Sequence, residues 1–190
     1  MGNIGIIGRA RSGKDTAGKY FVEQHGYRRV ALADPIKEAA LRTNPIVKVD
    51  HAAEYYRLAE DIAEFGWERA KDDTAEVRRI LQELSAAIRA LDEDFWLRLA
   101  LKATEEANDA GAPVIITDIR YPNEAASLAR AGFHLLHINR PGIPQMDHVS
   151  EKTLRPEDAR YLIRNDGTLD DFHAQLARVW DAIYAVEQVV

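Results

Sequence analysis

The chain has 190 residues, of which 46% are hydrophobic and 29% are charged, a length that suits one compact domain with its own core. The absence of cysteine excludes disulfides, thiolate metal sites and a cysteine nucleophile. The net charge is -6, which argues against a broad surface for binding nucleic acid polymers. The opening run Met1–Ala10 is too short to span a membrane and lacks the layout of a signal peptide. We therefore expect a soluble cytoplasmic protein, in which a small, locally basic site for an anionic ligand remains open.

Strands and helices are expected to alternate along the first part of the chain. Apolar runs and the glycines and prolines that end them predict a buried strand at Asn3–Ile7, a helix at Asp15–His25, a strand at Arg28–Ala33 and a helix from Pro35 to about Arg42. The segment from Asn44 to Asp73 is expected to be irregular at first and then helical and acidic.

The middle of the chain gives the clearest helix, Thr74–Leu91. Its apolar side chains recur at helical spacing and form one stripe, made by Val77, Ile80, Leu81, Leu84, Ile88 and Leu91. Another helix is expected from about Asp94 to Ala110, where Gly111 and Pro113 end it.

The last part of the chain continues the alternation. The β-branched run Val114–Thr117 is typical of a strand buried on both faces. After it we expect a helix at Asn123–Ala131, a strand at His134–Asn139, a loop or lid at Arg140–Asp158, a strand at Tyr161–Arg164 and a closing helix at Leu169–Val189. This order predicts an α/β fold with a parallel sheet of about five strands covered on both faces.

One motif with a defined chemistry lies between the first strand and the first helix. Gly8 to Thr16 reads Gly-Arg-Ala-Arg-Ser-Gly-Lys-Asp-Thr and matches G-x-x-x-x-G-K, the phosphate-binding P-loop. Its glycines let successive backbone N–H groups face phosphate oxygens, and Lys14 would bridge the terminal phosphates. Asp15 stands where Ser or Thr usually contacts Mg²⁺, so Asp15 or the next residue, Thr16, is a candidate metal ligand.

Charged residues at strand ends extend this site. Asp118 follows the strand Val114–Thr117, the place of the acid that holds Mg²⁺ in P-loop enzymes, although a turn cap is the alternative. Arg11, Arg120 and Arg140 fall in loops after strands, where a doubly wound sheet binds ligands. Their planar donor forks suit phosphate.

A polar stripe on the long helix offers a second set of contacts. Arg78, Gln82, Ser85 and Arg89 share one helix face, which is either a solvated surface or a contact for a base and a monophosphate. Two histidines on one strand, His134 and His137, are expected to pack rather than to catalyse.

These residues together resemble the bacteriophage deoxynucleoside monophosphate kinases. The likeness runs over nearly the whole chain, through Arg11–Thr16, Leu32–Lys37, Gly66-Trp67 with Ala70-Lys71, Val77–Gln82, Asp118–Arg120 with Asn123–Ala125, Arg140–Gly142, His148–Glu151 and Asn165–Leu169. It implies a P-loop kinase fold of three α/β/α layers, formed by residues 1–190 as one domain. A helical acceptor-binding insertion would lie at about 44–91 and a lid at about 140–158.

The resemblance also implies roles for individual residues. ATP would be bound by Gly8, Arg11, Ser12, Gly13, Lys14, Asp15, Thr16, Asn165, Asp166 and Gly167, and Mg²⁺ by Asp15, Thr16 or Asp118. The acceptor would contact Asp34, Lys37, Arg78, Gln82, Arg89, Arg120, Glu124, His148 and Glu151, while Lys14, Asp118, Arg120 and Arg140 would act in catalysis. Ser85-Ala86-Ala87 departs from the family pattern Gly-Thr-Glu and puts the base preference in doubt.

Three alternatives to this reading remain. The Ser-Gly-Lys-Asp signature also resembles phosphomevalonate kinase of the animal type, and Asn-Asp-Gly at 165–167 resembles dephospho-coenzyme A kinase. A nucleotide-binding protein without transferase activity is the third. The family resemblance further suggests a homodimer with no membrane partner.

Overall fold

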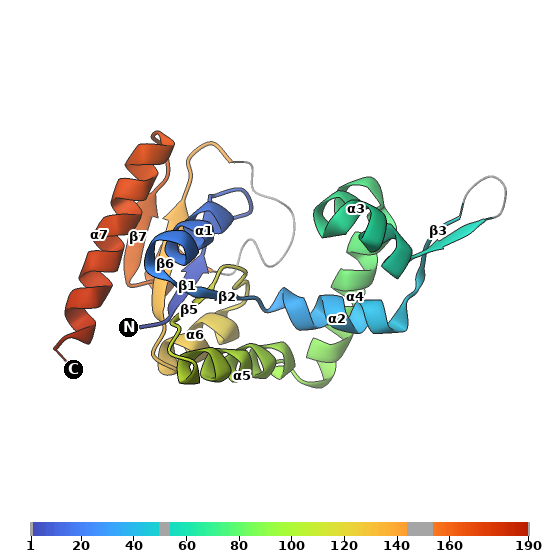
Figure 1. Cartoon of the computed structure of the whole chain (residues 1–190), viewed down its shortest axis with the longest axis horizontal. Coiled ribbons are helices and arrows are strands. Elements are labelled where there is room, and N and C mark those ends of the chain that lie inside the picture. The colour runs from blue at the N-terminus through green and yellow to red at the C-terminus, as the bar shows by residue number, and fades with distance from the viewer. Residues whose placement is uncertain (1, 50–53, 144–153, 190) are drawn as a thin grey trace. The chain divides into compact units, whose positions relative to one another are not determined.

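The computed structural model describes residues 2–49, 54–143 and 154–189, and its packing divides the chain into two units (Figure 1). One unit contains Met1–Leu32 and Ala100–Val190, and the other contains Ala33–Leu99. The helical segment that the sequence places at about 44–91 therefore lies within a unit that is wider at both ends. Its role in binding an acceptor stays a prediction.

A five-stranded sheet organises the first unit, in the order β2-β5-β1-β6-β7. Every neighbouring pair in it is parallel, which confirms the predicted α/β class. Its strands are β1 (Ile4–Ile7), β2 (Arg28–Val30), β5 (Val114–Ile116), β6 (His134–Asn139) and β7 (Tyr161–Arg164). All residues of β1 and β5 are buried, which explains why both are continuous apolar runs.

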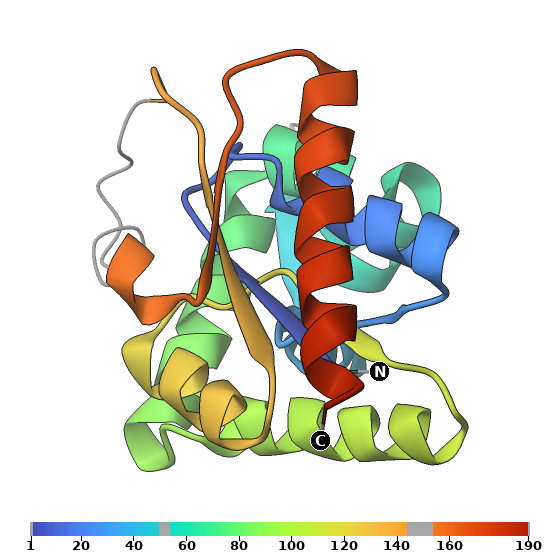
Figure 2. The same ribbon diagram turned by 90° about the vertical axis from the view of Figure 1, so that its left-hand side faces the viewer.

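Helices cover both faces of this sheet (Figure 2). The chain moves from β1 to β2 in one direction along the sheet and from β5 to β6 in the other. Because parallel crossovers are right-handed, α1 (Lys14–His25) and α6 (Pro122–Arg130) lie on opposite faces. The last helix, α7 (Leu169–Glu187), shares the α1 face, where its apolar side chains join Phe21 and the strand residues in one core. Thus α1, which follows the phosphate-binding motif, packs against both the sheet and α7.

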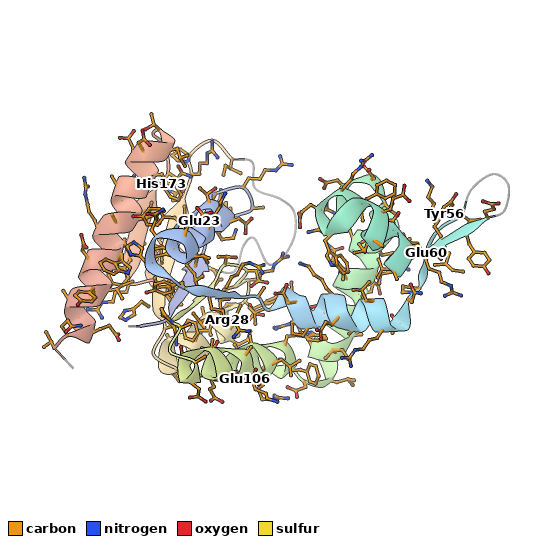
Figure 3. All side chains as sticks on the ribbon, in the orientation of Figure 1. Glu23, Arg28, Tyr56, Glu60, Glu106 and His173 are labelled. Atoms are coloured by element: carbon orange, nitrogen blue, oxygen red, sulfur yellow. The ribbon has the colours of Figure 1, made fainter. Side chains whose placement is uncertain are left out.

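The second unit is mainly helical. It contains α2 (Ala33–Thr43), β3 (Ile46–Val49), β4 (Tyr55–Arg57), α3 (Leu58–Asp73), α4 (Ala75–Leu91) and the first residues of α5 (Phe95–Asp109). The carboxylate of Glu60 accepts a hydrogen bond from the backbone of Arg57 at the start of α3 (Figure 3). Four residues of the α4 stripe pack together as predicted, with Ile80, Leu81 and Leu84 beside buried Val77, whereas Leu91 at its end is 86% exposed.

The segments expected to be irregular contain some regular structure. Residues 46–57 include an antiparallel pair, β3 with β4, where the sequence indicated irregular chain. In the predicted lid, residues 144–153 lie outside the described part of the structure, and a 3-10 helix occupies Pro156–Asp158. Among the described residues, none of the helices combines the length and the apolar composition that a bilayer crossing requires.

Candidate functional site

The loop after β1 has the backbone conformation that phosphate binding requires. Gly8 and Gly13 have φ values of 147° and 107°, and Arg11 between them is left-handed at 62°. A Cβ atom on Gly8 would lie 2.5 Å from the carbonyl oxygen of Ile138. Only glycine fits this position, because both the conformation and the space exclude a side chain. The loop therefore presents bare backbone at the N-terminus of α1.

A side chain from the loop after β7 anchors this phosphate-binding loop. The Asn165 amide donates a hydrogen bond to the Ser12 carbonyl at 2.8 Å, and the Asn165 backbone N–H donates to Asn139 at 2.7 Å. A Cβ on Gly13 would lie 2.6 Å from the same amide nitrogen. The side chain of Ser12 is 1% exposed. Ser12 and Asn165 thus shape the loop, while their predicted contacts with ATP stay predictions.

The lysine of the motif is held at the loop. Its ammonium group donates to the carbonyl oxygens of Gly8 at 2.8 Å and Arg9 at 2.7 Å. Lys14 is the first residue of α1, so the positive end of the helix dipole adds to its charge. Three sources of positive potential meet here: the ammonium, the helix terminus and the loop amides. This combination is typical of a site for a polyphosphate.

Asp118 lies at the same edge of the sheet, just past the end of β5. Its carboxylate accepts a hydrogen bond from the backbone N–H of Leu32 at 3.1 Å and so ties the ends of β2 and β5 together. Asp118 is half-buried, whereas Asp15 and Thr16 in the first turn of α1 are exposed. Mg²⁺ prefers oxygen ligands and usually takes only one or two protein carboxylates, with phosphates and water completing the shell. This donor set fits that requirement.

The segment after Asp118 carries the predicted catalytic arginine. Arg120 is exposed, and buried Glu124 accepts hydrogen bonds from the backbone N–H groups of Arg120 at 2.8 Å and Tyr121 at 3.0 Å. Glu124 therefore caps the start of α6 and fixes the backbone that presents Arg120. Arg11 and Arg140 are also exposed, in the loops that follow β1 and β6.

The loop after β7 is rigidly held. Asp166 pairs with Arg164, and Thr168 and Asp171 form a reciprocal cap at the start of α7. Hydrogen bonds from the Thr168 side chain and then from its backbone hold the pKa of Asp171 below its usual value. Asn165, Asp166 and Gly167 of this loop were predicted to lie near the adenine of ATP. The hydrogen bond from Asn165 to Ser12 places the loop beside the phosphate-binding loop.

His137 on β6, which the sequence indicated only as a packing residue, is a titratable neighbour of the phosphate-binding loop. Burial, with Arg9 and Lys14, keeps the pKa of His137 below its usual 6.5, while Glu157 and Asp158 oppose the shift. Its partner on the same strand, His134, is buried and bonded to Glu187 at 2.8 Å, as packing predicts.

We expect the His137 ring to titrate below pH 6.5 in the folded protein. As the pH falls, the His137 ring is therefore protonated in the unfolded chain before it is protonated in the folded protein. The free energy of unfolding consequently decreases as the pH falls below 6.5. Phosphates bound near Lys14 and Arg9 would favour the imidazolium, so a non-hydrolysable ATP analogue should raise the midpoint. NMR titration of the ring measures both effects. In a Lys14→Ala variant the rise should vanish; a rise of the same size there would contradict the expectation.

The second unit groups basic side chains around one carboxylate. A hydrogen bond from Lys71 at 2.7 Å, together with the charges of Lys71, Lys37 and Arg78, lowers the pKa of Glu68. The Lys37 ammonium lies over the ring of Trp67 at 5.7 Å. Lys37 and Arg78 were predicted acceptor contacts, whereas Lys71 was quoted only as part of the resemblance. The three cations form a candidate anion site within this unit.

The other residues predicted to contact the acceptor do not belong to this group of three cations. Asp34 forms an ion pair with Lys37 at 3.6 Å, Gln82 is exposed on α4, and Arg89 donates to the Glu93 carbonyl at 3.0 Å. His148 and Glu151 lie outside the described residues.

The chain matches the family model described as deoxynucleotide monophosphate kinase over residues 3–69 and 43–176. A protein of Acanthamoeba polyphaga mimivirus, provisionally named a deoxynucleotide monophosphate kinase, is 28% identical over 91% of this chain and 93% of its own. The deoxynucleotide monophosphate kinase of Enterobacteria phage T4 is 28% identical over 55% of this chain and 45% of its own, so this chain matches less than half of that protein.

A solved structure supports the fold. Dephospho-CoA kinase from Campylobacter jejuni superposes with a TM-score of 0.50 over 96% of this chain and 98% of its own, at 14% identity. At that identity the likeness shows a shared P-loop kinase fold, and it does not favour dephospho-coenzyme A as the acceptor.

Proposed function

Because the chain belongs to the deoxynucleotide monophosphate kinase family, we propose that it transfers the terminal phosphoryl group of ATP to a deoxynucleoside monophosphate. An oxygen of the acceptor phosphate attacks the γ-phosphorus in line, the bond to the β-phosphate oxygen breaks, and dNDP and ADP leave. The observation that carries the proposal is the glycine-lined loop from Gly8 to Lys14 at the carboxyl edge of the sheet, in a chain that matches this family.

Positive groups of the first unit support the transfer. The loop amides and Lys14 bind the ATP phosphates, and Arg120 and Arg140 neutralise charge that spreads over the transferred group. Arg11 adds a third guanidinium from the loop itself. No general base is needed, because a monophosphate dianion is already a nucleophile near neutral pH. Catalysis then rests on position and charge.

Magnesium would be held by oxygen ligands of the same edge. Asp118, together with Asp15 or Thr16, would share the ion with the ATP phosphates and water. The ion would neutralise charge on the bridging oxygens. Asp118 already fastens β2 to β5, so its carboxylate is fixed before the ion arrives.

The second unit would supply the acceptor contacts. Lys37, Lys71 and Arg78 all act on Glu68 through their charges, and an anionic phosphate would replace the acids that now pair with them, Asp34, Glu68 and Asp72. Gln82, on the same face of α4 as Arg78, would offer an amide for a base edge. We propose further that the enzyme is cytoplasmic, that its substrates are small molecules, and that it binds neither a nucleic acid polymer nor a membrane. Its homodimeric state is measurable by light scattering.

An acceptor panel tests the proposal. The protein is given MgATP and, in turn, each of the four common dNMPs, phosphomevalonate, dephospho-coenzyme A or no acceptor, and ADP release is measured in a coupled assay. We expect turnover with at least one dNMP and little without an acceptor. If phosphomevalonate or dephospho-coenzyme A is turned over and no dNMP is, the proposed dNMP acceptor is wrong. ADP release that no acceptor changes would indicate a nucleotide-binding module.

A further inference from the structure

The two parts of α3 direct opposite helical faces into one core. Leu58 in the first part and Ala70 in the second are both buried in the same apolar cluster, and Trp67 packs against it. In a continuous helix, which turns by about 100° per residue, Trp67 would point about 180° away from Leu58. Phe65 and Arg69 would lie within about 20° of Leu58, yet Phe65 is 38% exposed and the Arg69 side chain is 67% exposed. The second part of α3 is therefore turned over relative to the first.

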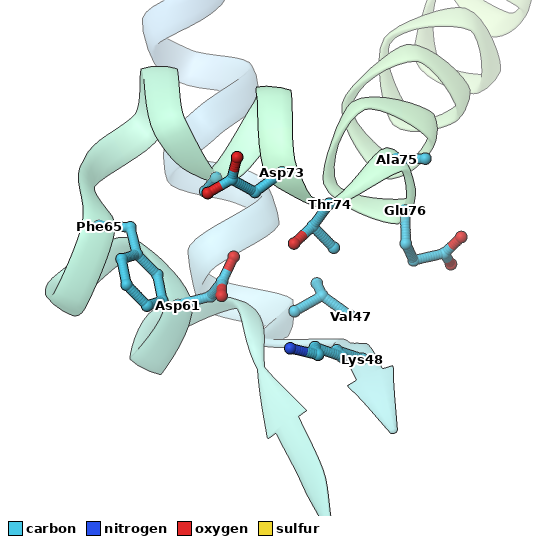
Figure 4. A pocket seen from close by; sticks show the side chains of 9 residues that line it. Val47, Lys48, Asp61, Phe65, Asp73, Thr74, Ala75 and Glu76 are labelled. Atoms are coloured by element: carbon cyan, nitrogen blue, oxygen red, sulfur yellow. The ribbon is translucent and has the colours of Figure 1, made fainter. Parts of the chain in front are cut away.

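Gly66 makes this change of face. Its φ of 73° and ψ of 166° fall in a region that is open almost only to glycine. Within the described part of the chain, a Cβ atom here would meet nothing within 4 Å beyond its own helix and neighbours, so the conformation and not the space requires glycine. Figure 4 shows the result at a cavity of about 370 Å³, which Asp61 and Phe65 line from the first part and Asp73 from the second. Ala70 lines it too, although a continuous helix would point Ala70 about 180° away from Asp61.

The change of face determines which cation of α3 joins the candidate anion site. The side chain of Lys71 is 24% exposed and donates to Glu68 at 2.7 Å. Arg78 of α4 donates to the Lys71 carbonyl at 3.3 Å. The charges of all three cations of the site act on Glu68. Without the change of face, Arg69 would occupy the core side of α3, and Lys71 would be carried away from Lys37 and Arg78.

We propose that Gly66 is a positioning residue for the acceptor, because its backbone conformation brings Lys71 to Lys37 and Arg78, and the three cations together hold a phosphate dianion. The inference rests on the proposed function, in which this group binds the acceptor phosphate. Hydrogen bonds between cations and phosphate are stronger than neutral ones, so removing one cation from the group weakens binding markedly. The loss affects the bound acceptor before and during transfer alike, and it therefore raises KM for the dNMP more than it lowers kcat.

Steady-state kinetics of the whole protein with MgATP and the preferred dNMP test the inference. Gly66→Ala should raise KM for the dNMP about tenfold or more. KM for ATP should stay within about twofold of the wild type, because the phosphate-binding loop belongs to the first unit. The matched control is Gly111→Ala in the first unit, where φ is 81° and a Cβ again meets nothing within 4 Å in the described chain. It should lower the thermal midpoint and leave both KM values unchanged.

A second pair of variants keeps Gly66 and decides the matter if Gly66→Ala does not fold. Lys71→Gln and Arg69→Gln each remove one positive charge from the same part of α3. Lys71→Gln should raise KM for the dNMP about tenfold or more, whereas Arg69→Gln should keep the wild-type value. The reverse order, or a KM for the dNMP that neither Lys71→Gln nor a folded Gly66→Ala changes, overturns the inference.

Titration of the Glu68 carboxyl by NMR separates this inference from the proposed activity, because it needs no turnover. The pKa of Glu68 is lowered by Lys71 and by the charges of Lys37 and Arg78. In Gly66→Ala it should rise toward its usual value, and in Gly111→Ala it should not change. A wild type that turns over no dNMP would overturn the proposed function, and the titration would still decide whether Gly66 places the three cations. An unchanged pKa of Glu68 in folded Gly66→Ala overturns the inference whatever the activity.

Discussion

Replacing Lys14 by Ala is expected to lower kcat for phosphoryl transfer by about 10³-fold or more, equivalent to roughly 4 kcal/mol of transition-state stabilisation. The ammonium is held at the loop by the carbonyls of Gly8 and Arg9, so it is in place before ATP binds. Its loss removes the charge that the sequence motif predicts for binding the terminal phosphates. A coupled ADP-release assay with the preferred dNMP measures the effect.

The fold should survive this change. Two partly exposed hydrogen bonds are lost, each worth about 1 kcal/mol. The control is Lys19→Ala on the same helix, where Lys19 pairs with Glu23 at 3.6 Å in solvent. Exposed ion pairs contribute little, so Lys19→Ala should keep full activity. If Lys14→Ala kept more than a tenth of the wild-type kcat, the phosphate-binding role of Lys14 would be wrong.

The sequence predicted the first unit better than the second because its signals are local. Val114–Thr117 is an uninterrupted β-branched run, and its first three residues form β5, which is buried throughout. The backbone conformation at positions 8 and 13 requires glycine, so this requirement is visible directly in the sequence motif. Such features depend on neighbours in the sequence, and they need no knowledge of distant contacts.

The hairpin of the second unit gave no comparable signal. In β3 (Ile46–Val49) only Val47 is buried, and all three residues of β4 (Tyr55–Arg57) are exposed. A strand pair that buries so little has no reason to alternate apolar and polar residues. The propensity of Ile, Val and Tyr for strands was the remaining indication.

The grouping of Lys71 with Lys37 and Arg78 was missed for a different reason. Gly66 breaks the helical path of α3, so a helix drawn through residues 58–73 assigns the later residues to the wrong face. Glycine inside an otherwise helical pattern was the visible indication of this break.

The capping role of Glu124 was also visible in the local sequence. Pro122 and Glu124 occupy the first and third helical positions of α6, which is the pattern of a helix cap.

Asp118→Asn is expected to lower kcat about 10²-fold and to raise the Mg²⁺ concentration needed for half-maximal rate. The amide keeps an oxygen for the Leu32 N–H, so the tie between β2 and β5 is preserved while the charge is lost. A neutral ligand binds Mg²⁺ less well than a carboxylate. The rate is measured against Mg²⁺ at saturating ATP and dNMP, and the thermal midpoint should stay close to that of the wild type.

Asp118→Ala separates the two roles of this side chain. It removes the charge and also leaves the N–H of buried Leu32 without this acceptor, which costs about 1–3 kcal/mol of stability. We therefore expect both variants to lose the same activity, but only Asp118→Ala to lose thermal stability. Full activity in Asp118→Asn together with instability in Asp118→Ala would show that Asp118 only fastens the strands. Since Asp118 ties the end of β2 to that of β5, the proposed metal ligand and the integrity of the sheet edge depend on one carboxylate, and only the pair of substitutions distinguishes the two roles.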